Sequence, residues 1–321
     1  MPDAHMEDRK FYLNYHLMLP YSNVFEQGGM WDRNQIVTPD TQIQLLTPMG
    51  TLVQPANIKD ICMARAVELA ALVQNTDKKI HIFWSGGIDS TVVLMCFREV
   101  LPANKIVVMH TPESLAEYQG FFEQHIQGTF ETFQFSMATV WKAVDFACAN
   151  GIAVTGEIGD QIYGSVLYLE RGKDWLTQPW ENFHAEITAN ESYQRFVQAC
   201  PQKITNTAEF LWWVNYSMKY QLVQCRMLLD NTVSQLNQNF YHFFDTKSFN
   251  DYAVSTPMED KIPGYELEAY KKPLRDVIYQ LSNDATYAYT KPKVRSLVPI
   301  YGRFTQRKRA VAIDTNWKRY Y

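Results

Sequence analysis

Residues 81–91 read HIFWSGGIDST, and this stretch predicts the fold of the chain around it. The apolar run at residues 80–84 is short enough for a buried strand, and the apolar run at residues 91–97 can begin a helix. Two adjacent glycines separate these runs. We therefore predict a buried strand that turns sharply into a helix.

The turn has the composition of a phosphate-binding loop. Gly86 and Gly87 allow the backbone to adopt positive φ and to approach a ligand closely. The backbone N–H groups of such a turn, and the dipole of the helix that follows it, favour an anion. Ser85 and Ser90 can add hydroxyl donors, whereas the carboxylate of Asp89 would repel a bare phosphate. Asp89 fits this site if it holds Mg²⁺, which prefers oxygen ligands and bridges to phosphate.

This loop is not a Walker loop, because no Gly-Lys-Ser/Thr sequence follows at the required spacing. Residues 85–90, SGGIDS, instead resemble the pyrophosphate loop of the N-type ATP pyrophosphatases. Those enzymes split ATP between the α- and β-phosphates and leave AMP on an acceptor oxygen. The alternative is a strand–turn–helix unit that contains two glycines by chance.

Strands and helices are expected to alternate through the first half of the chain. Apolar or alternating segments predict strands at residues 80–84, 105–109, 129–135 and 152–155. Periodicity and cap residues predict helices at residues 57–72, 91–100, 111–122 and 139–150. This order implies a parallel sheet with helices on both faces, which binds ligands beyond the carboxyl ends of its strands. A mainly helical part follows, whose aromatic residues at 178–239 are expected to form a core stripe rather than a ligand site.

A second motif, TGEIGDQIYG at residues 155–164, places acidic residues in a glycine-rich turn after a predicted strand. Because both turns follow strands, we expect them to converge at the strand ends of one sheet. It resembles the second signature of the asparagine-synthetase family, roughly Ser-Gly-Glu-Gly-x-Asp-Glu-hydrophobic-aromatic-Gly-Gly. Three positions depart from that pattern, because Ile158 replaces a glycine, Gln161 a glutamate and Ser165 the last glycine. We expect Gln161 to alter a local substrate contact. The alternative interpretation of the segment is a flexible acidic turn.

Later segments resemble the same family. Residues 242–249 are similar to its Pro-Phe-Leu-Asp stretch, and residues 271–275 and 291–293 follow its late pattern. In that pattern an Arg-x-Lys lies in a loop over the active site, with Lys293 at the lysine position and Lys291 at the arginine position. The resemblance covers residues 57–300 and implies an adenine-nucleotide α-hydrolase fold. Residues 1–56 are then an N-terminal extension, and residues 301–321 a basic tail. Within the extension, the Pro-Met-Gly sequence at residues 48–50 predicts a small hairpin at residues 42–53.

The resemblance implies an ATP-dependent synthetase that forms amides. A carboxylate would become an acyl-adenylate with release of pyrophosphate, and ammonia or an amine would then displace AMP. ATP would lie across the strand ends, with adenine against the backbone near Val108 and Met109. Asp89 and Asp160 would hold Mg²⁺.

Further roles follow from the same resemblance. The β- and γ-phosphates would be held by the loop and by the second turn, at residues Ser85, Gly86, Gly87, Ser90 and Gly156. Glu157 would orient or deprotonate the amine. Lys293 would stabilise charge at the α-phosphate and at the tetrahedral intermediate. We expect residues 291–293 to be mobile without ligand, because the stretch is polar.

Composition limits the class of protein. Hydrophobic residues make up 46% and charged residues 20%, as in ordinary globular proteins. The net charge of −4 argues against a generic nucleic-acid binder. Five scattered cysteines form no Cys-x-x-Cys pair and indicate reduced thiols in a cytoplasmic protein. The sequence has no apolar run long enough to cross a membrane.

The expected partners are small molecules, a carboxylate together with ammonia or an amine. Residues 1–84 do not supply a nucleophile, base and oxyanion hole together, so we expect no glutamine hydrolysis by this chain. Ammonia could instead come from a separate supplying or carrier protein. Residues 295–321 hold seven basic residues and one acidic residue, which suits a solvated surface, a lid over polyphosphate or a nucleic-acid contact. Three alternatives stay open: an enzyme that adenylates a nucleobase or RNA carbonyl, a nucleotide-binding module without chemistry, and a protein that acts only in assembly.

Overall fold

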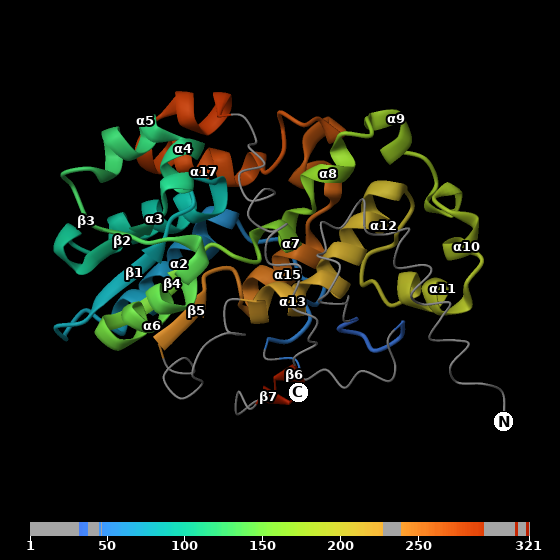
Figure 1. Cartoon of the computed structure of the whole chain (residues 1–321). Coiled ribbons are helices and arrows are strands. Elements are labelled where there is room, and N and C mark those ends of the chain that lie inside the picture. The colour runs from blue at the N-terminus through green and yellow to red at the C-terminus, as the bar shows by residue number, and fades with distance from the viewer. Residues whose placement is uncertain are drawn as a thin grey trace.

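The computed structural model describes residues 32–37, 45, 47–226, 239–291, 312–313 and 319–320. Within these residues, five parallel strands form one sheet in the order β3-β2-β1-β4-β5 (Figure 1). They are β1 (Lys79–Phe83), β2 (Ile106–His110), β3 (Glu131–Gln134), β4 (Gly151–Thr155) and β5 (Phe240–His242). The four predicted strands are confirmed, with ends that differ by at most two residues. The fifth, β5, was not predicted, because three residues are too few to show an alternating pattern.

The strand order reverses at the centre of the sheet. Ile82 of β1 lies opposite Val108 of β2 on one side and opposite Val154 of β4 on the other. The chain moves outward from β1 to β3, and then returns to build β4 and β5 on the other side. A crevice for a ligand forms at such a reversal, beyond the carboxyl ends of the strands. Both sequence motifs follow strands at this boundary, the first after β1 and the second after β4.

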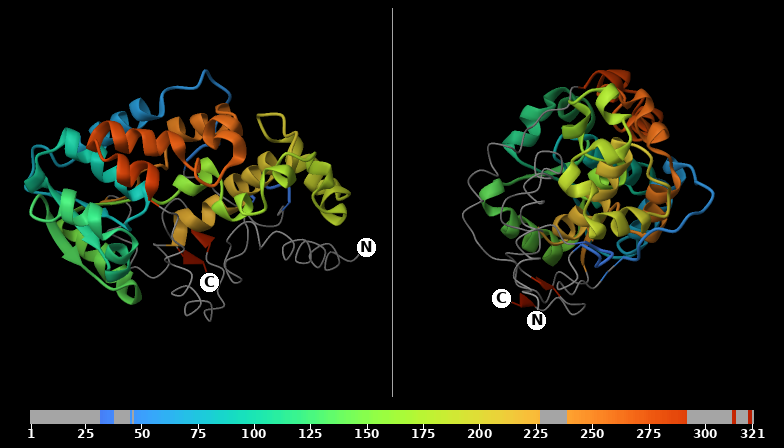
Figure 2. Two further views of the ribbon diagram at one scale, coloured as in Figure 1. Left: turned by 90° about the horizontal axis from the view of Figure 1, so that it is seen from above. Right: turned by 90° about the vertical axis from the view of Figure 1, so that its right-hand side faces the viewer.

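Helices cover both faces of the sheet, as predicted (Figure 2). On one face α2 (Ile58–Ala71), α3 (Ile88–Val100) and α17 (Lys272–Ser282) pack against one another, and on the other face α6 (Val140–Asn150) packs against β4. Side chains alternate along the strands between the two cores. For example, Ile82 belongs to the core of α2 and α3, whereas Phe83 belongs to the core of α6. The α/β class is therefore confirmed.

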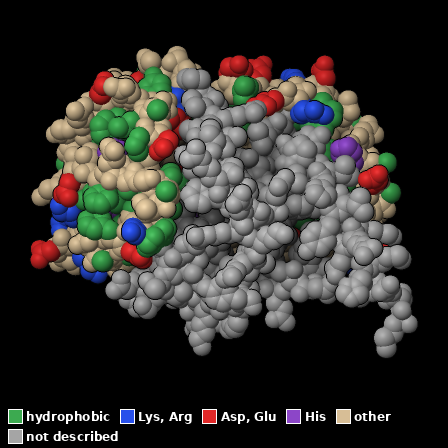
Figure 3. Space-filling view, viewed as in Figure 1, with side chains coloured by type: hydrophobic (Ala, Val, Ile, Leu, Met, Phe, Trp, Pro, Cys, Tyr) green, Lys and Arg blue, Asp and Glu red, His purple; other side chains and the backbone are tan. Residues whose placement is uncertain are grey.

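The surface around α6 is apolar in part. Hydrophobic side chains are visible over α6 and β3 in Figure 3. Phe146 of α6 is 41% exposed and stacks on Phe133 of β3, with ring centroids 4.6 Å apart. This stacked pair joins α6 to β3, which is an edge strand of the sheet.

The part of the chain that follows β4 is mainly helical (Figure 1). Its α-helices are α7 (Gly159–Tyr163), α8 (Val166–Leu169), α9 (Lys173–Leu176), α10 (Ala185–Thr188), α11 (Glu191–Gln198), α12 (Thr207–Val214), α13 (Tyr220–Arg226), α15 (Lys247–Ser255) and α16 (Met258–Lys261). Between them lie the 3-10 helix η4 (Trp180–Asn182) and the π-helix η5 (Asn215–Lys219), whereas the 3-10 helix η6 (Pro263–Tyr265) follows α16 and the π-helix η7 (Thr286–Thr290) follows α17. The aromatic stripe of this part is core, as predicted, since each of its members is at most 1% exposed: Phe210, Trp212, Trp213, Tyr216 and Tyr220. None of the helices in the described ranges combines the length and the apolar character that a membrane crossing requires. Two short strands, β6 (Ala312–Ile313) and β7 (Arg319–Tyr320), pair antiparallel near the end of the chain.

Two expectations about local structure were wrong. The helix predicted at residues 111–122 breaks at Tyr118, which has φ −160° and ψ 81°. It is divided into α4 (Pro112–Glu117), α5 (Gln119–Phe121) and the helical turn η2 (Phe122–Ile126). The hairpin predicted at residues 42–53 is also wrong over its described part, because residues 47–53 form no strand. Their N–H groups bond elsewhere, as in the 2.9 Å bond from Thr51 N to the Asp251 carboxylate of α15.

Candidate active site

The loop after β1 turns into α3 through two glycines. Gly86 has a φ of +79°, and a Cβ there would lie 2.6 Å from the carbonyl oxygen of Ser114. The position therefore requires glycine. The Ser90 hydroxyl accepts a hydrogen bond from Ser85 N at 3.0 Å and donates one to the Gly87 carbonyl at 3.1 Å. Ser90 thus closes the turn. The Ser85 hydroxyl lies 3.0 Å from the Ser90 hydroxyl, and because Ser85 is exposed it can rotate to donate to a ligand instead.

The turn after β4 lies directly against the start of α3. A Cβ on Gly156 would lie 2.7 Å from Ser90 N, and one on Gly159 would lie 2.5 Å from Asp89 Cγ. Side chains at these two positions would separate the turns. The glycines of the second motif therefore allow the two turns to meet, as we expected from their positions after strands.

A lysine joins the acidic residues of the two motifs. Lys271 Nζ donates to Asp160 Oδ1 at 2.5 Å and also to Asp89 Oδ2. Tyr270 OH donates to the same Asp160 oxygen at 2.7 Å. The Lys271 side chain is 2% exposed, against 20% for Asp89 and 42% for Asp160. Burial alone would lower the pKa of Lys271, but the charges of Asp160 and then Asp89 outweigh burial, so the pKa is raised and the lysine stays an ammonium.

The donor set is compatible with Mg²⁺ bound together with a nucleotide. Asp89 and Asp160 bring carboxylate oxygens from two turns to one ammonium. Over the described ranges, no cluster of three or more His, Cys, Asp or Glu side chains could hold a metal. Mg²⁺ is commonly held by one or two carboxylates, with phosphate oxygens and water as its other ligands. The two aspartates therefore fit a magnesium site that a nucleotide completes.

Lys271 is a site residue that we did not predict. It belongs to the segment at residues 271–275 that follows the late family pattern, but sequence alone assigned it no role. Its backbone adopts the left-handed conformation, with φ 57°, at the N-cap of α17. Its two partners lie 182 and 111 residues earlier in the chain. No local pattern could have identified this contact.

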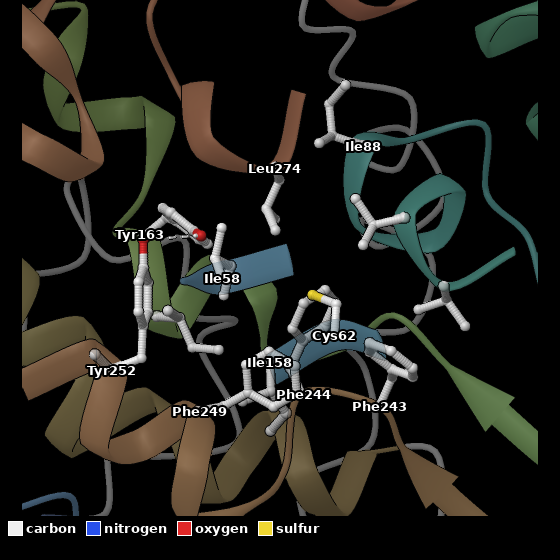
Figure 4. Close-up of a cluster of buried hydrophobic side chains, with 14 of the residues drawn as sticks. Ile58, Cys62, Ile88, Ile158, Tyr163, Phe243, Phe244, Phe249, Tyr252 and Leu274 are labelled. Carbon is white, nitrogen blue, oxygen red and sulfur yellow. Dashed lines mark hydrogen bonds between the residues drawn. The ribbon is translucent and has the colours of Figure 1, made fainter. Parts of the chain in front are cut away.

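Ile158 occupies a left-handed backbone position where the family pattern has glycine. Its φ is 78° and its ψ is −19°, a conformation that costs a β-branched residue roughly 1–2 kcal/mol. The side chain is 1% exposed and lies in the hydrophobic cluster with Phe243, Phe244 and Phe249 (Figure 4). Burial of this side chain can offset the backbone strain, because a fully buried Ile contributes roughly 1.5–3 kcal/mol.

The other acidic and amide residues of the second turn differ in exposure. Glu157 is half-buried, and its N–H donates to the Thr155 hydroxyl at 3.3 Å. It lies in the same turn as Asp160, and its role toward an amine stays a prediction. Gln161 is 1% exposed and lies in α7, so its side chain does not face solvent beside Glu157.

Two residues predicted to lie against adenine are inside the sheet. Val108 and Met109 are fully buried in β2, which pairs with β1 and β3. The Met109 carbonyl accepts a hydrogen bond from Trp84 N at 2.8 Å. The carbonyl is thus bonded within the protein, and the adenine contact stays a prediction.

Lys291 does not begin a mobile polar loop. It is 4% exposed, and its Nζ lies 2.8 Å from Glu117 Oε1, whose side chain is 7% exposed. The mobility that we expected at residues 291–293 is therefore wrong for Lys291, because a buried ion pair holds this residue. Lys293 lies outside the described residues, as do the basic residues of the tail other than Arg319 of β7.

Comparison of the chain with models of known protein families gave no match, and comparison with curated protein sequences gave none either.

Proposed function

We propose that the protein is an ATP-dependent ligase that forms an amide and releases AMP and pyrophosphate. The observation that carries this proposal is the convergence of the two motif turns where the strand order reverses, with Asp89 and Asp160 on one ammonium. A sheet of adenine-nucleotide α-hydrolase type, with ATP across its strand ends, is part of the proposal. The support for it is the parallel strand order and the position of the loop after β1.

The first turn would bind the pyrophosphate end of ATP. The N–H groups at the start of α3 and the dipole of this 13-residue helix favour an anion. Ser85 is exposed beside them and can donate its hydroxyl. Asp89 and Asp160 would hold Mg²⁺, which neutralises charge on the departing pyrophosphate when it is bound.

Lys271 would keep the two carboxylates together before the nucleotide arrives. Two carboxylates that contact the same ammonium lie close together, and in a partly buried site they would repel each other. The ammonium between them would offset one of the two negative charges and hold the two turns together for the substrate. We therefore place Lys271 with Asp89 and Asp160 in the binding machinery.

The reaction would proceed in two displacements. A carboxylate oxygen of the substrate attacks the α-phosphorus, and the bond to the bridging oxygen breaks to release pyrophosphate. The nitrogen of ammonia or an amine then attacks the acyl carbon and loses a proton to Glu157, and AMP leaves with the former carboxylate oxygen. Lys293 would stabilise the negative charge that develops at the phosphate and at the tetrahedral intermediate.

We also propose that the protein acts in the cytoplasm. Cys62, Cys96, Cys148 and Cys200 are free thiols and all four are buried. Free thiols persist in the reducing cytoplasm, whereas secreted proteins commonly form disulfides.

The test is incubation with Mg-ATP and pooled carboxylates and amines, followed by mass spectrometry for AMP, pyrophosphate and a new amide. Asp89→Asn and Asp160→Asn should each lower turnover by at least a hundredfold and leave the circular dichroism spectrum unchanged. Asp60→Asn, at an exposed position of α2, is the matched control and should retain full turnover. ADP and orthophosphate as primary products, or normal pyrophosphate release by either site variant, would overturn the proposal.

A further inference from the structure

A buried chain of hydrogen bonds runs beneath the loop after β1. Trp84 Nε1 donates to Thr91 Oγ1 at 2.9 Å, and Thr91 Oγ1 lies 2.7 Å from Tyr287 OH. Tyr287 OH then donates to the Gly86 carbonyl at 2.8 Å. The three side chains are at most 1% exposed, so water does not compete for these bonds.

All the hydrogen bonds in this series must point the same way, because of the groups at its two ends. An indole N–H can only donate and a carbonyl oxygen can only accept. The single hydroxyl hydrogen of Tyr287 is directed to Gly86, so Thr91 must be the donor in its contact with Tyr287, while the Thr91 oxygen accepts from Trp84. Burial raises the pKa of Tyr287 well above its ordinary value, so the hydroxyl keeps the proton that it donates.

This direction fixes the orientation of one peptide group in the loop. Because a trans peptide is planar, its C=O and N–H point in opposite directions. The Gly86 carbonyl is held toward the buried Tyr287, so the N–H of Gly87 points to the other side of the loop. There it makes only a long bond, 3.3 Å to the hydroxyl of the exposed Ser85. A ligand oxygen that approaches the start of α3 can accept a better hydrogen bond from this N–H.

Tyr287 is itself held from both ends of its segment. Its backbone N–H donates to Asp284 Oδ1 at 2.8 Å, and Asp284 Oδ2 lies 3.1 Å from His125. Its ring packs against Phe121, with centroids 4.4 Å apart. Four residues later the segment ends in the buried ion pair of Lys291. The hydroxyl therefore has a fixed position from which it can hold the loop.

We propose that Tyr287 is a positioning residue that orients the Gly86–Gly87 peptide so that the N–H of Gly87 faces a bound pyrophosphate group. This inference rests on the proposed function, because it assumes that the loop binds the pyrophosphate end of ATP. Tyr287 acts through Gly86 and makes no contact with the ligand. It links the loop to a segment 201 residues away, which continues toward Lys293.

The test measures the affinity of the full chain for Mg-pyrophosphate and for Mg-ATP by isothermal titration calorimetry. Tyr287→Phe should weaken binding of both about tenfold, because an oriented N–H bond to a charged group is lost. Thr91→Val keeps the last bond of the chain but removes the hydroxyl that orients Tyr287, and should weaken binding about threefold. Thr91→Ser retains that hydroxyl and should bind as the wild type does.

Tyr216→Phe is the matched control. Tyr216 is also a fully buried tyrosine whose hydroxyl contacts the backbone of a glycine, 3.2 Å from Gly50 N, but it lies in the helical part. It should lower the melting temperature about as much as Tyr287→Phe and leave both affinities unchanged. A role of Tyr287 in stability alone would make the two variants alike in affinity.

Each outcome decides between the two claims. A wild-type chain that binds neither anion overturns the proposed function and this inference with it. Wild-type binding together with equal affinities for Tyr287→Phe and Tyr216→Phe overturns the inference alone. If Tyr287→Phe does not fold, the two Thr91 variants test the inference instead. Equal affinities for Thr91→Val and Thr91→Ser then overturn it.

Discussion

Replacing Lys271 with methionine should destabilise the protein, because it leaves two carboxylates facing each other. The stem of the side chain is kept, and only the ammonium that contacts Asp160 at 2.5 Å and also contacts Asp89 is lost. Removal of one partner from a buried ion pair costs about 3–5 kcal/mol. The Asp160 side chain is 42% exposed, so water screens part of its charge. We therefore expect the free energy of unfolding to fall by about 3 kcal/mol, at the lower end of that range.

The measurement is urea unfolding at pH 8, with Lys272→Met as the matched control. Lys272 is the next residue, and its ion pair with Asp276 is on the surface, with the lysine side chain 50% exposed. The control should therefore change the free energy by at most about 0.5 kcal/mol. If Lys271→Met is as stable as Lys272→Met, the ion pairs do not stabilise the site and our reasoning is wrong. Mg²⁺ should also stabilise Lys271→Met more than the wild type, because no ammonium then competes for the carboxylates.

The stability difference between the wild type and Lys271→Met should also depend on pH. The pKa of Lys271 is raised in the folded protein, so folding favours its protonated form. The stability that it contributes is fully present below the unfolded-state pKa of about 10.4 and is lost as the pH rises through the higher folded-state pKa. The difference between the wild type and Lys271→Met should thus be constant from pH 6 to 9 and shrink at more alkaline pH.

Three further predictions concern other parts of the site. Lys293→Ala should bind Mg-ATP normally in calorimetry and lose adenylate formation in single turnover. Weak binding of ATP with normal adenylate formation per bound ATP would show that Lys293 acts only in binding. Ile158→Gly should lower the free energy of unfolding by about 2 kcal/mol, because the lost burial outweighs the relief of backbone strain, and a more stable variant would show the reverse. Glu117→Gln should lower the free energy of unfolding by about 3 kcal/mol, because it leaves the buried ammonium of Lys291 without its charged partner. Combining it with Lys291→Met should recover part of this loss. The absence of any recovery in the double variant would show that the two side chains do not act as a pair.

The sequence by itself determined the local units of this protein. Residues 80–100 form the predicted strand, turn and helix, because apolar runs and two glycines specify them without help from distant residues. The side-chain cap of α2 at Asn57 is likewise local, since its oxygen accepts from Lys59 N two residues on. The sequence also indicated that the two acidic turns would meet, because both follow strands of one parallel sheet.

Only the tertiary structure decided which distant residues complete the site. Lys271 reaches Asp89 across 182 residues, and Tyr287 reaches Gly86 across 201. These contacts depend on the packing of α17 against α3 and of η7 against α17, which hydrophobic periodicity does not specify. The left-handed backbone of Ile158 was hidden for a related reason, because local preference favours glycine there and only the surrounding core can hold an isoleucine in that conformation.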